Sequence, residues 1–131
     1  MTARNPDEAG SDTKFAAGPS DRAGGSAGRT LGGLFTASGG NAMGTLHADV
    51  YEVPRGFTDP GVALTRTVVV PLSFEKVVGQ MTGLAAEINA ANIRYGILST
   101  NSNAATFSLF QRMGVTVQPS VWVPGYDTRV P

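Results

Sequence analysis

The stretch Ser73-Phe-Glu-Lys-Val-Val-Gly-Gln-Met-Thr-Gly-Leu-Ala-Ala-Glu-Ile-Asn-Ala-Ala-Asn92 decides the fold, because it carries the clearest helical pattern in the chain. Ser73 is a favourable N-cap, and Glu75 lies in the first turn, where the helix dipole favours a negative charge. Gly79 and Gly83 lower helix propensity, and we expect them to permit close approach to a sheet. Apolar residues follow at helical spacing at Phe74, Val77, Val78, Met81, Leu84, Ala85 and Ile88. The pattern predicts an amphipathic helix that Asn92 closes.

A second helix is predicted on the carboxyl side of the first, from about Ser102 to Met113. It follows the segment from Ile93 to Leu98, and Gly114 stands where a helix-ending glycine is common. Its buried face is expected to contain Ala105 or Thr106, Phe107, Leu109, Phe110 and Met113.

Several segments have the composition of strands. Thr45–Val53 alternates imperfectly between apolar and polar residues, and Ala63–Leu72 is rich in β-branched residues, so we expect these two strands to pair antiparallel. A shorter strand is expected around Lys14–Ala17, and another over Val115–Val123, which Pro119 interrupts. Helices and strands together predict a small α+β fold, with an antiparallel sheet packed against two helices.

The domain boundaries are predicted from polar and glycine-rich composition. Met1–Asp12 is polar, so we expect residues 1–12 to form a disordered tail ahead of a single domain at residues 13–131. Glycine is dense over residues 18–44, which predicts a long loop. A loop of this length is either a lid over a site or an ordinary connection between elements.

Composition excludes several functional classes. The 131-residue chain has ten Lys and Arg balanced by ten Asp and Glu, so no electrostatic surface for nucleic acid is expected. It has no cysteine and one histidine, which leaves no disulfide, no cysteine nucleophile and no recognisable metal-ligand set. No apolar run approaches the roughly 20 residues of a membrane span, and there is no signal core at the amino terminus. We expect a soluble chain with no cofactor.

Ser102 is the candidate nucleophile. It lies between Asn101 and Asn103 at the predicted start of the second helix, where unpaired N–H groups and the helix dipole stabilise a developing negative charge. N–H groups near Asn103 would then hold the oxyanion. Asn101, Ser102 and Asn103 are equally all good capping residues, so the alternative is a helix cap without chemistry.

His47 is the candidate base. It lies on a predicted strand, and Asp49 two residues along would share its face and could orient the imidazole as the third member of a triad. The alternative is an ordinary strand histidine with a solvated acid beside it.

The pattern Tyr95, Leu98, Asn101-Ser102-Asn103, Phe107 and Gly114 resembles the permuted papain-like proteins, the PPPDE and DeSI-type thiol peptidases and related bacterial modules near the NlpC/P60 group. The resemblance is firmest over residues 73–116. It implies a papain-like domain in which Ser102 stands in the place of the nucleophilic cysteine. Asn101 and Asn103 match the flanking residues, and Tyr95 is a further substrate-binding candidate.

The resemblance leaves two positions for the histidine. His47 suits the permuted order, whereas matching Phe15–Pro19 to the turn that follows the histidine strand in some bacterial relatives would place that strand before Met1. In the second case a partner chain or a missing amino-terminal segment would complete the sheet.

Two functional hypotheses follow. In the first, the chain is a hydrolase or acyltransferase that acts on an amide, isopeptide or ester bond, with Ser102 as nucleophile, His47 as base and Asp49 as the orienting acid. In the second, it is a catalytically inactive papain-like module that binds a partner or has a structural role in a larger bacterial or phage protein.

Overall fold

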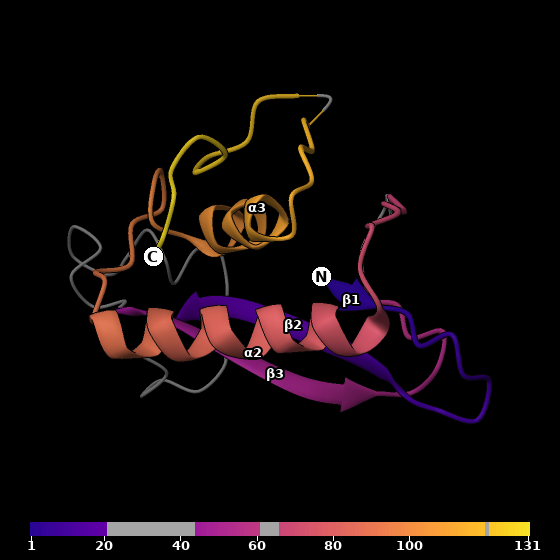
Figure 1. Ribbon diagram of the computed structural model, residues 1–131. Helices are drawn as coiled ribbons and strands as arrows, with labels where there is room; N and C mark the ends of the chain where they lie inside the picture. Colours follow the sequence, from indigo (N-terminus) through magenta and orange to yellow (C-terminus); the bar gives the residue numbers. More distant parts are fainter. Residues whose placement is uncertain (21–43, 61–65, 120) are drawn as a thin grey trace.

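The computed structural model describes residues 1–20, 44–60, 66–119 and 121–131. They form a small α+β fold: a three-stranded antiparallel sheet in the order β1-β2-β3, packed against two helices (Figure 1). The elements are β1 (Thr2–Ala3), β2 (Asp12–Pro19), β3 (Leu46–Val53), α2 (Phe74–Ala91) and α3 (Ser102–Arg112). The predicted fold class is confirmed. Residues 21–43 of the predicted glycine-rich loop lie outside the described residues.

The two faces of the sheet differ in what covers them. Phe15 of β2 and Leu46 and Ala48 of β3 point towards the helices, since they belong to one hydrophobic core with buried residues of α2 and α3. Side chains alternate between faces along a strand. His47 and Asp49 therefore lie on the opposite face.

Helix α2 begins and ends where the sequence predicts. The Ser73 side chain accepts a hydrogen bond from Lys76 N, and Asn92 ends the helix in the left-handed conformation with φ 51°. The buried residues recur at helical spacing, which places them on one stripe against the core. They are Val77, Met81, Leu84, Ala85 and Ile88.

Helix α3 also agrees with its predicted range. Asn101 is its N-cap and Met113 its C-cap, and Gly114 follows with φ 74°. A positive φ is strained for residues with a Cβ, so glycine suits this position.

The outer edge of β3 is covered over its first half by the chain itself. The Asn89 side chain of α2 accepts a hydrogen bond from Ala48 N and donates one to Ala48 O, both 2.9 Å long. Leu46 N donates to Ile93 O at 2.7 Å. Asn89 thus pairs with Ala48 as a neighbouring strand would, because one amide side chain offers both a donor and an acceptor.

The expectation that residues 1–12 form a disordered tail is wrong. Thr2–Ala3 forms β1 and pairs with β2, which itself begins at Asp12. Asp12 has no exposed surface, and its carboxylate accepts hydrogen bonds from Asn5 N, Arg4 and Gly56 N, at 3.0, 2.6 and 2.9 Å. One buried acid therefore joins three segments of the chain, which composition could not indicate.

Two predicted strands are not formed by the described residues that fall within them. Residues 66–72 and 115–119 have no strand partner in the described part of the chain, and β3 pairs with β2 instead. Val69 is 89% exposed, and Pro71, two residues further on, has no backbone N–H to donate to a neighbouring strand. The β-branched composition of residues 66–72 gives strand propensity, but propensity alone does not supply a pairing partner.

Gly79 and Gly83 do not allow a close approach to the sheet, contrary to expectation. A Cβ added at either position would meet nothing within 4 Å outside its immediate neighbours and the helix backbone. Both residues lie on the exposed side of α2.

Replacing both Gly79 and Gly83 with alanine is therefore expected to stabilise the protein. Each substitution removes unfolded-state entropy and adds helix propensity, for about 0.5–1 kcal/mol per site. Urea unfolding of the double variant measures the change. An unchanged or lower free energy of unfolding would contradict the described exposure of these two positions.

Candidate functional site

The Asn101-Ser102-Asn103 motif caps α3. Asn101 is 4% exposed and has extended backbone angles, as an N-cap residue does. Its Oδ1 accepts hydrogen bonds from Asn103 N at 3.0 Å and from Ala104 N at 3.1 Å. Two of the N–H groups that an oxyanion would need are therefore already occupied by Asn101.

The same motif holds the carboxyl-terminal segment against the helix. Asn101 Nδ2 donates to Ile97 O at 2.6 Å and to Pro124 O at 3.1 Å, and Asn103 Nδ2 donates to Pro124 O at 2.9 Å. Gly125 lies against this cluster, because a Cβ there would stand 2.3 Å from Asn101 Oδ1. We call this contact of Asn101 and Asn103 with Pro124 and Gly125 the asparagine clamp.

Contacts further along α3 extend the clamp. Phe107 meets Tyr126 edge to face, with ring centroids 4.9 Å apart, and Ser108 Oγ accepts a hydrogen bond of 2.9 Å from the buried Val130 N. The motif that suggested catalysis therefore has a clear structural task, which is to fix residues 124–130 along α3.

Ser102 has no base beside it in the part of the chain that the structure describes. It is half-buried, and its carbonyl accepts a hydrogen bond from Thr106 Oγ1 at 2.9 Å. Among the residues that the structure describes, no histidine or acid hydrogen-bonds to the Ser102 hydroxyl. A serine hydroxyl is a weak nucleophile without a positioned base.

His47 lies on the other side of the sheet. Its Nε2 is 3.1 Å from Asp49 Oδ1, so the predicted contact between these two side chains is present, and the side chains are 39% and 51% exposed. Ser102 begins α3, which shares the hydrophobic core on the opposite face. The structure does not bring Ser102 and His47 together, and the dyad predicted from the sequence is corrected accordingly.

Tyr95 is a packing residue. It is half-buried against the hydrophobic core, and burial raises the pKa of its hydroxyl above the ordinary value. Nothing in its contacts among the described residues assigns it to a substrate.

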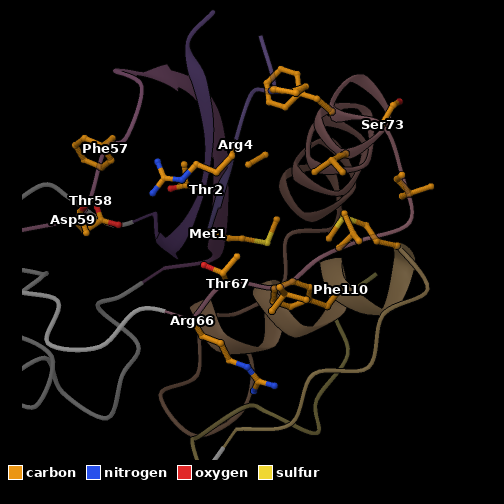
Figure 2. A pocket seen from close by; sticks show the side chains of 18 residues that line it. Met1, Thr2, Arg4, Phe57, Thr58, Asp59, Arg66, Thr67, Ser73 and Phe110 are labelled. Atoms are coloured by element: carbon orange, nitrogen blue, oxygen red, sulfur yellow. The ribbon is translucent and has the colours of Figure 1, made fainter. Parts of the chain in front are cut away.

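A cavity of about 630 Å³ lies elsewhere, beside β1. We call it the β1 groove (Figure 2). One wall is formed by residues 1–4 and 57–59, and the other by residues 66–74 with parts of α2 and α3. Its lining comprises Met1, Thr2, Ala3, Arg4, Pro6, Phe57, Thr58, Asp59, Arg66, Thr67, Val68, Val70, Leu72, Ser73, Phe74, Val77, Phe110 and Met113.

Thr2 presents its backbone polar groups to this groove. Met1 and Phe15 exchange two hydrogen bonds, 3.0 Å from Met1 N to Phe15 O and 2.8 Å from Phe15 N to Met1 O. Hydrogen-bonded and non-hydrogen-bonded pairs alternate along an antiparallel ladder. The next pair, Thr2 with Lys14, is therefore non-hydrogen-bonded, so the N–H and C=O of Thr2 point away from β2.

The lining of the groove combines an apolar side with a polar rim. Val77 and Met113 are buried core residues, and Leu72 and Phe110 pack against the same core. Figure 2 shows Arg4 and Asp59 at one end of the groove and Arg66 at another part of its rim.

Comparisons with protein-family models, curated proteins and solved structures found no match. No helix among the described residues has the length and apolar character needed to cross a membrane. The described ranges also hold no cluster of three or more acids and histidines able to bind a metal ion.

Sequence reasoning missed the β1 groove because its walls come from segments with misleading local signals. The polar composition of residues 1–12 predicts a tail, and the β-branched composition of Ala63–Leu72 predicts a paired strand. Only the paired register of β1 reveals that the backbone groups of Thr2 point away from β2, and the local sequence carries no signal for that register.

Proposed function

We propose that this chain is a papain-like module without a working catalytic centre, which binds an extended peptide segment of a partner protein in the β1 groove. The segment adds to the sheet as a fourth strand beside β1. The observation that carries the proposal is the backbone edge of Thr2, which has no partner among the described residues and lies along a cavity of about 630 Å³. Strand addition to an open sheet edge is a recurring way of recognising peptides.

The two edges of the sheet support this choice of position. At β3 the chain satisfies its own backbone groups, through Asn89 at Ala48 and through Ile93 at Leu46. At β1 the groove lies directly along the edge, and the Thr2 backbone groups are oriented towards it. An added strand would therefore gain hydrogen bonds at β1 that the first half of β3 cannot offer.

The size and lining of the groove also fit a peptide. Cavities of roughly 300–1,000 Å³ are typical of ligand sites. Side chains of an added strand alternate between the two faces of the sheet. Because Ala3 belongs to the core on the helix side, alternate residues of the segment would meet Val77, Phe110 and Met113. We therefore expect apolar residues at every second position of the ligand.

The hydrolase hypothesis lacks its geometry in this arrangement, since Ser102 and His47 lie on opposite sides of the sheet and the Asn101 side chain occupies the N–H groups of Asn103 and Ala104. The binding hypothesis requires neither residue. The papain-like relationship is supported by the sequence pattern of residues 73–116 alone.

Selection from a displayed library of random octapeptides tests the proposal. We expect enriched peptides with apolar residues at alternate positions. Thr2→Pro is expected to weaken binding about fivefold, because it removes the backbone donor that faces the groove, at a cost near 1 kcal/mol. Thr2→Ala keeps that donor and is the matched control, expected to bind like the wild type. Fluorescence polarisation with synthetic peptides measures both affinities.

A second measurement separates lost contact from lost folding. N-methylation of the peptide at successive residues removes one backbone donor at a time and leaves the protein unchanged. Loss of affinity at every second position is expected from the alternation of ladder hydrogen bonds. Equal binding by Thr2→Pro and Thr2→Ala, or N-methylation effects without alternation, would reject strand addition at β1. Enrichment of no peptide at all would reject the proposed function.

A further inference from the structure

Among the described residues around the β1 groove, two positive groups lack a carboxylate partner. One is the Met1 ammonium, whose hydrogen bond to Phe15 O is part of the sheet, and the other is Arg66. Arg4 forms an ion pair with Asp12 at 2.6 Å, and Lys14 forms one with Asp59. Arg66 donates to Gln118 O at 2.8 Å but has no ion pair with any carboxylate in the described part of the chain. Arg66 therefore contributes an uncompensated positive charge to the rim.

The contact with Gln118 leaves Arg66 well suited to bind an anion. A guanidinium has five N–H donors in a planar fork that matches a carboxylate, and the single carbonyl contact uses one nitrogen. That contact also anchors the side chain to residues 115–119, so less side-chain freedom is lost on binding. Arg66 is exposed at the rim, where a ligand can reach it.

We infer that the peptide segment bound in the β1 groove carries a carboxylate that pairs with Arg66. This inference rests on the proposed function and specifies its ligand as an extended segment with alternating apolar residues and an acidic group. The carboxylate comes either from an Asp or Glu side chain or from the free carboxyl terminus of the segment. The two sources share the same chemistry and are separated in the experiment.

Two displayed libraries provide the test, one of internal octapeptides and one with free carboxyl termini. We expect the first to enrich Asp or Glu at one fixed position relative to the apolar residues, if the side chain is the source. If only the second library shows Arg66-dependent binding, the terminal carboxylate is the source. Either result supports the inference.

Affinities of a selected peptide then identify the cation. Replacing its acid with the matching amide is expected to weaken binding to the wild type by up to about fivefold, the upper end of what an exposed ion pair contributes. The same replacement is expected to have no effect on Arg66→Ala. Lys76→Ala, which removes an exposed charge that does not line the groove, is the matched control and should keep the full acid-to-amide difference. Raising the salt from about 0.1 M to about 1 M should reduce that difference in the wild type.

The outcomes separate this inference from the proposal beneath it. Two results would overturn the Arg66 assignment and leave strand addition intact, provided that Thr2→Pro weakens binding as expected. In the first, the selected peptides show no preference for an acid. In the second, the acid preference is unchanged in Arg66→Ala. Circular dichroism spectra that match the wild type establish that Arg66→Ala is folded. Arg66→Lys keeps the charge and is expected to retain part of the acid preference. If Arg66→Lys lost the acid preference completely and its spectrum also changed, the effect of Arg66 would come from packing, and the assignment would be overturned.

Discussion

Asp12→Ala is expected to lower the free energy of unfolding by roughly 3 kcal/mol, because it leaves buried N–H groups and the Arg4 guanidinium without their acceptor. The carboxylate of Asp12 is fully buried and accepts hydrogen bonds from Asn5 N, Arg4 and Gly56 N. Removing it disconnects β2 from the segments before and after it. Urea unfolding followed by circular dichroism measures the loss.

Asp49→Ala is the matched control for this substitution. Asp49 is an exposed acid on the neighbouring strand, and its side chain contacts only His47 among the interactions described. We expect its removal to change the free energy of unfolding by less than about 0.5 kcal/mol. Similar losses in the two variants would show that Asp12 does not have the central role assigned to it.

Asp12 also makes stability depend on pH in a defined window. Burial alone would raise the pKa of Asp12, but hydrogen bonds from Asn5 N, Arg4 and Gly56 N outweigh burial and lower the pKa from 3.8 to about 2. The folded state therefore favours the charged form, so this contribution is complete above pH 3.8 and is lost as the pH falls towards 2. Asp12→Asn should lack this part of the acid destabilisation, as pH-dependent unfolding curves of both proteins would reveal.

Asn101→Ala is expected to cost a similar amount, roughly 3 kcal/mol, because it removes an N-cap and two donors to backbone carbonyls at once. The carbonyls belong to Ile97 and Pro124, so the turn before α3 and the asparagine clamp are both affected. We expect residues 124–131 to lose protection, which hydrogen exchange or limited proteolysis would detect alongside the lower free energy of unfolding.

Ser102→Ala is the control that separates structure from catalysis. Its hydroxyl makes no hydrogen bond among those described, so we expect a change below about 0.5 kcal/mol and unaltered peptide binding. A structural clamp requires that Asn101→Ala lowers the free energy of unfolding strongly and that Ser102→Ala changes it little. If the two variants proved equally stable, or if Ser102→Ala alone abolished a measurable hydrolytic activity, the interpretation of this motif would have to be reversed.

The helices could be predicted from the sequence because their signals are local. Ser73 and Asn92 bound α2 through caps that act within one turn, and the apolar positions between them define its buried stripe. The strand at Thr45–Val53 was likewise visible from alternation and corresponds to β3. In each case the residues that carry the signal lie inside the element that they predict.

The remaining features depend on contacts between distant residues. Asp12 looked like part of a polar tail, yet it is buried by segments around Asn5 and Gly56. Residues 66–72 have strand composition but no partner strand in the described part of the chain. Ser102 illustrates a different difficulty, because the residues that cap a helix are also those that surround a nucleophile at a helix start. Sequence alone could not choose between a cap and a nucleophile. The structure places His47 on the face of the sheet away from Ser102, so these two residues do not form a catalytic pair in this arrangement.

The Asn89 side chain that covers Ala48 has a consequence for self-association. Copies of a small sheet protein can stack head to tail into fibrils when one copy's free edge matches the other edge of the next. Here an amide from α2 already occupies the backbone groups of Ala48 in the first half of β3, so a neighbouring molecule's β1 cannot extend along that half without displacing the side chain. Asn89 therefore disfavours edge-to-edge stacking at this border of the sheet.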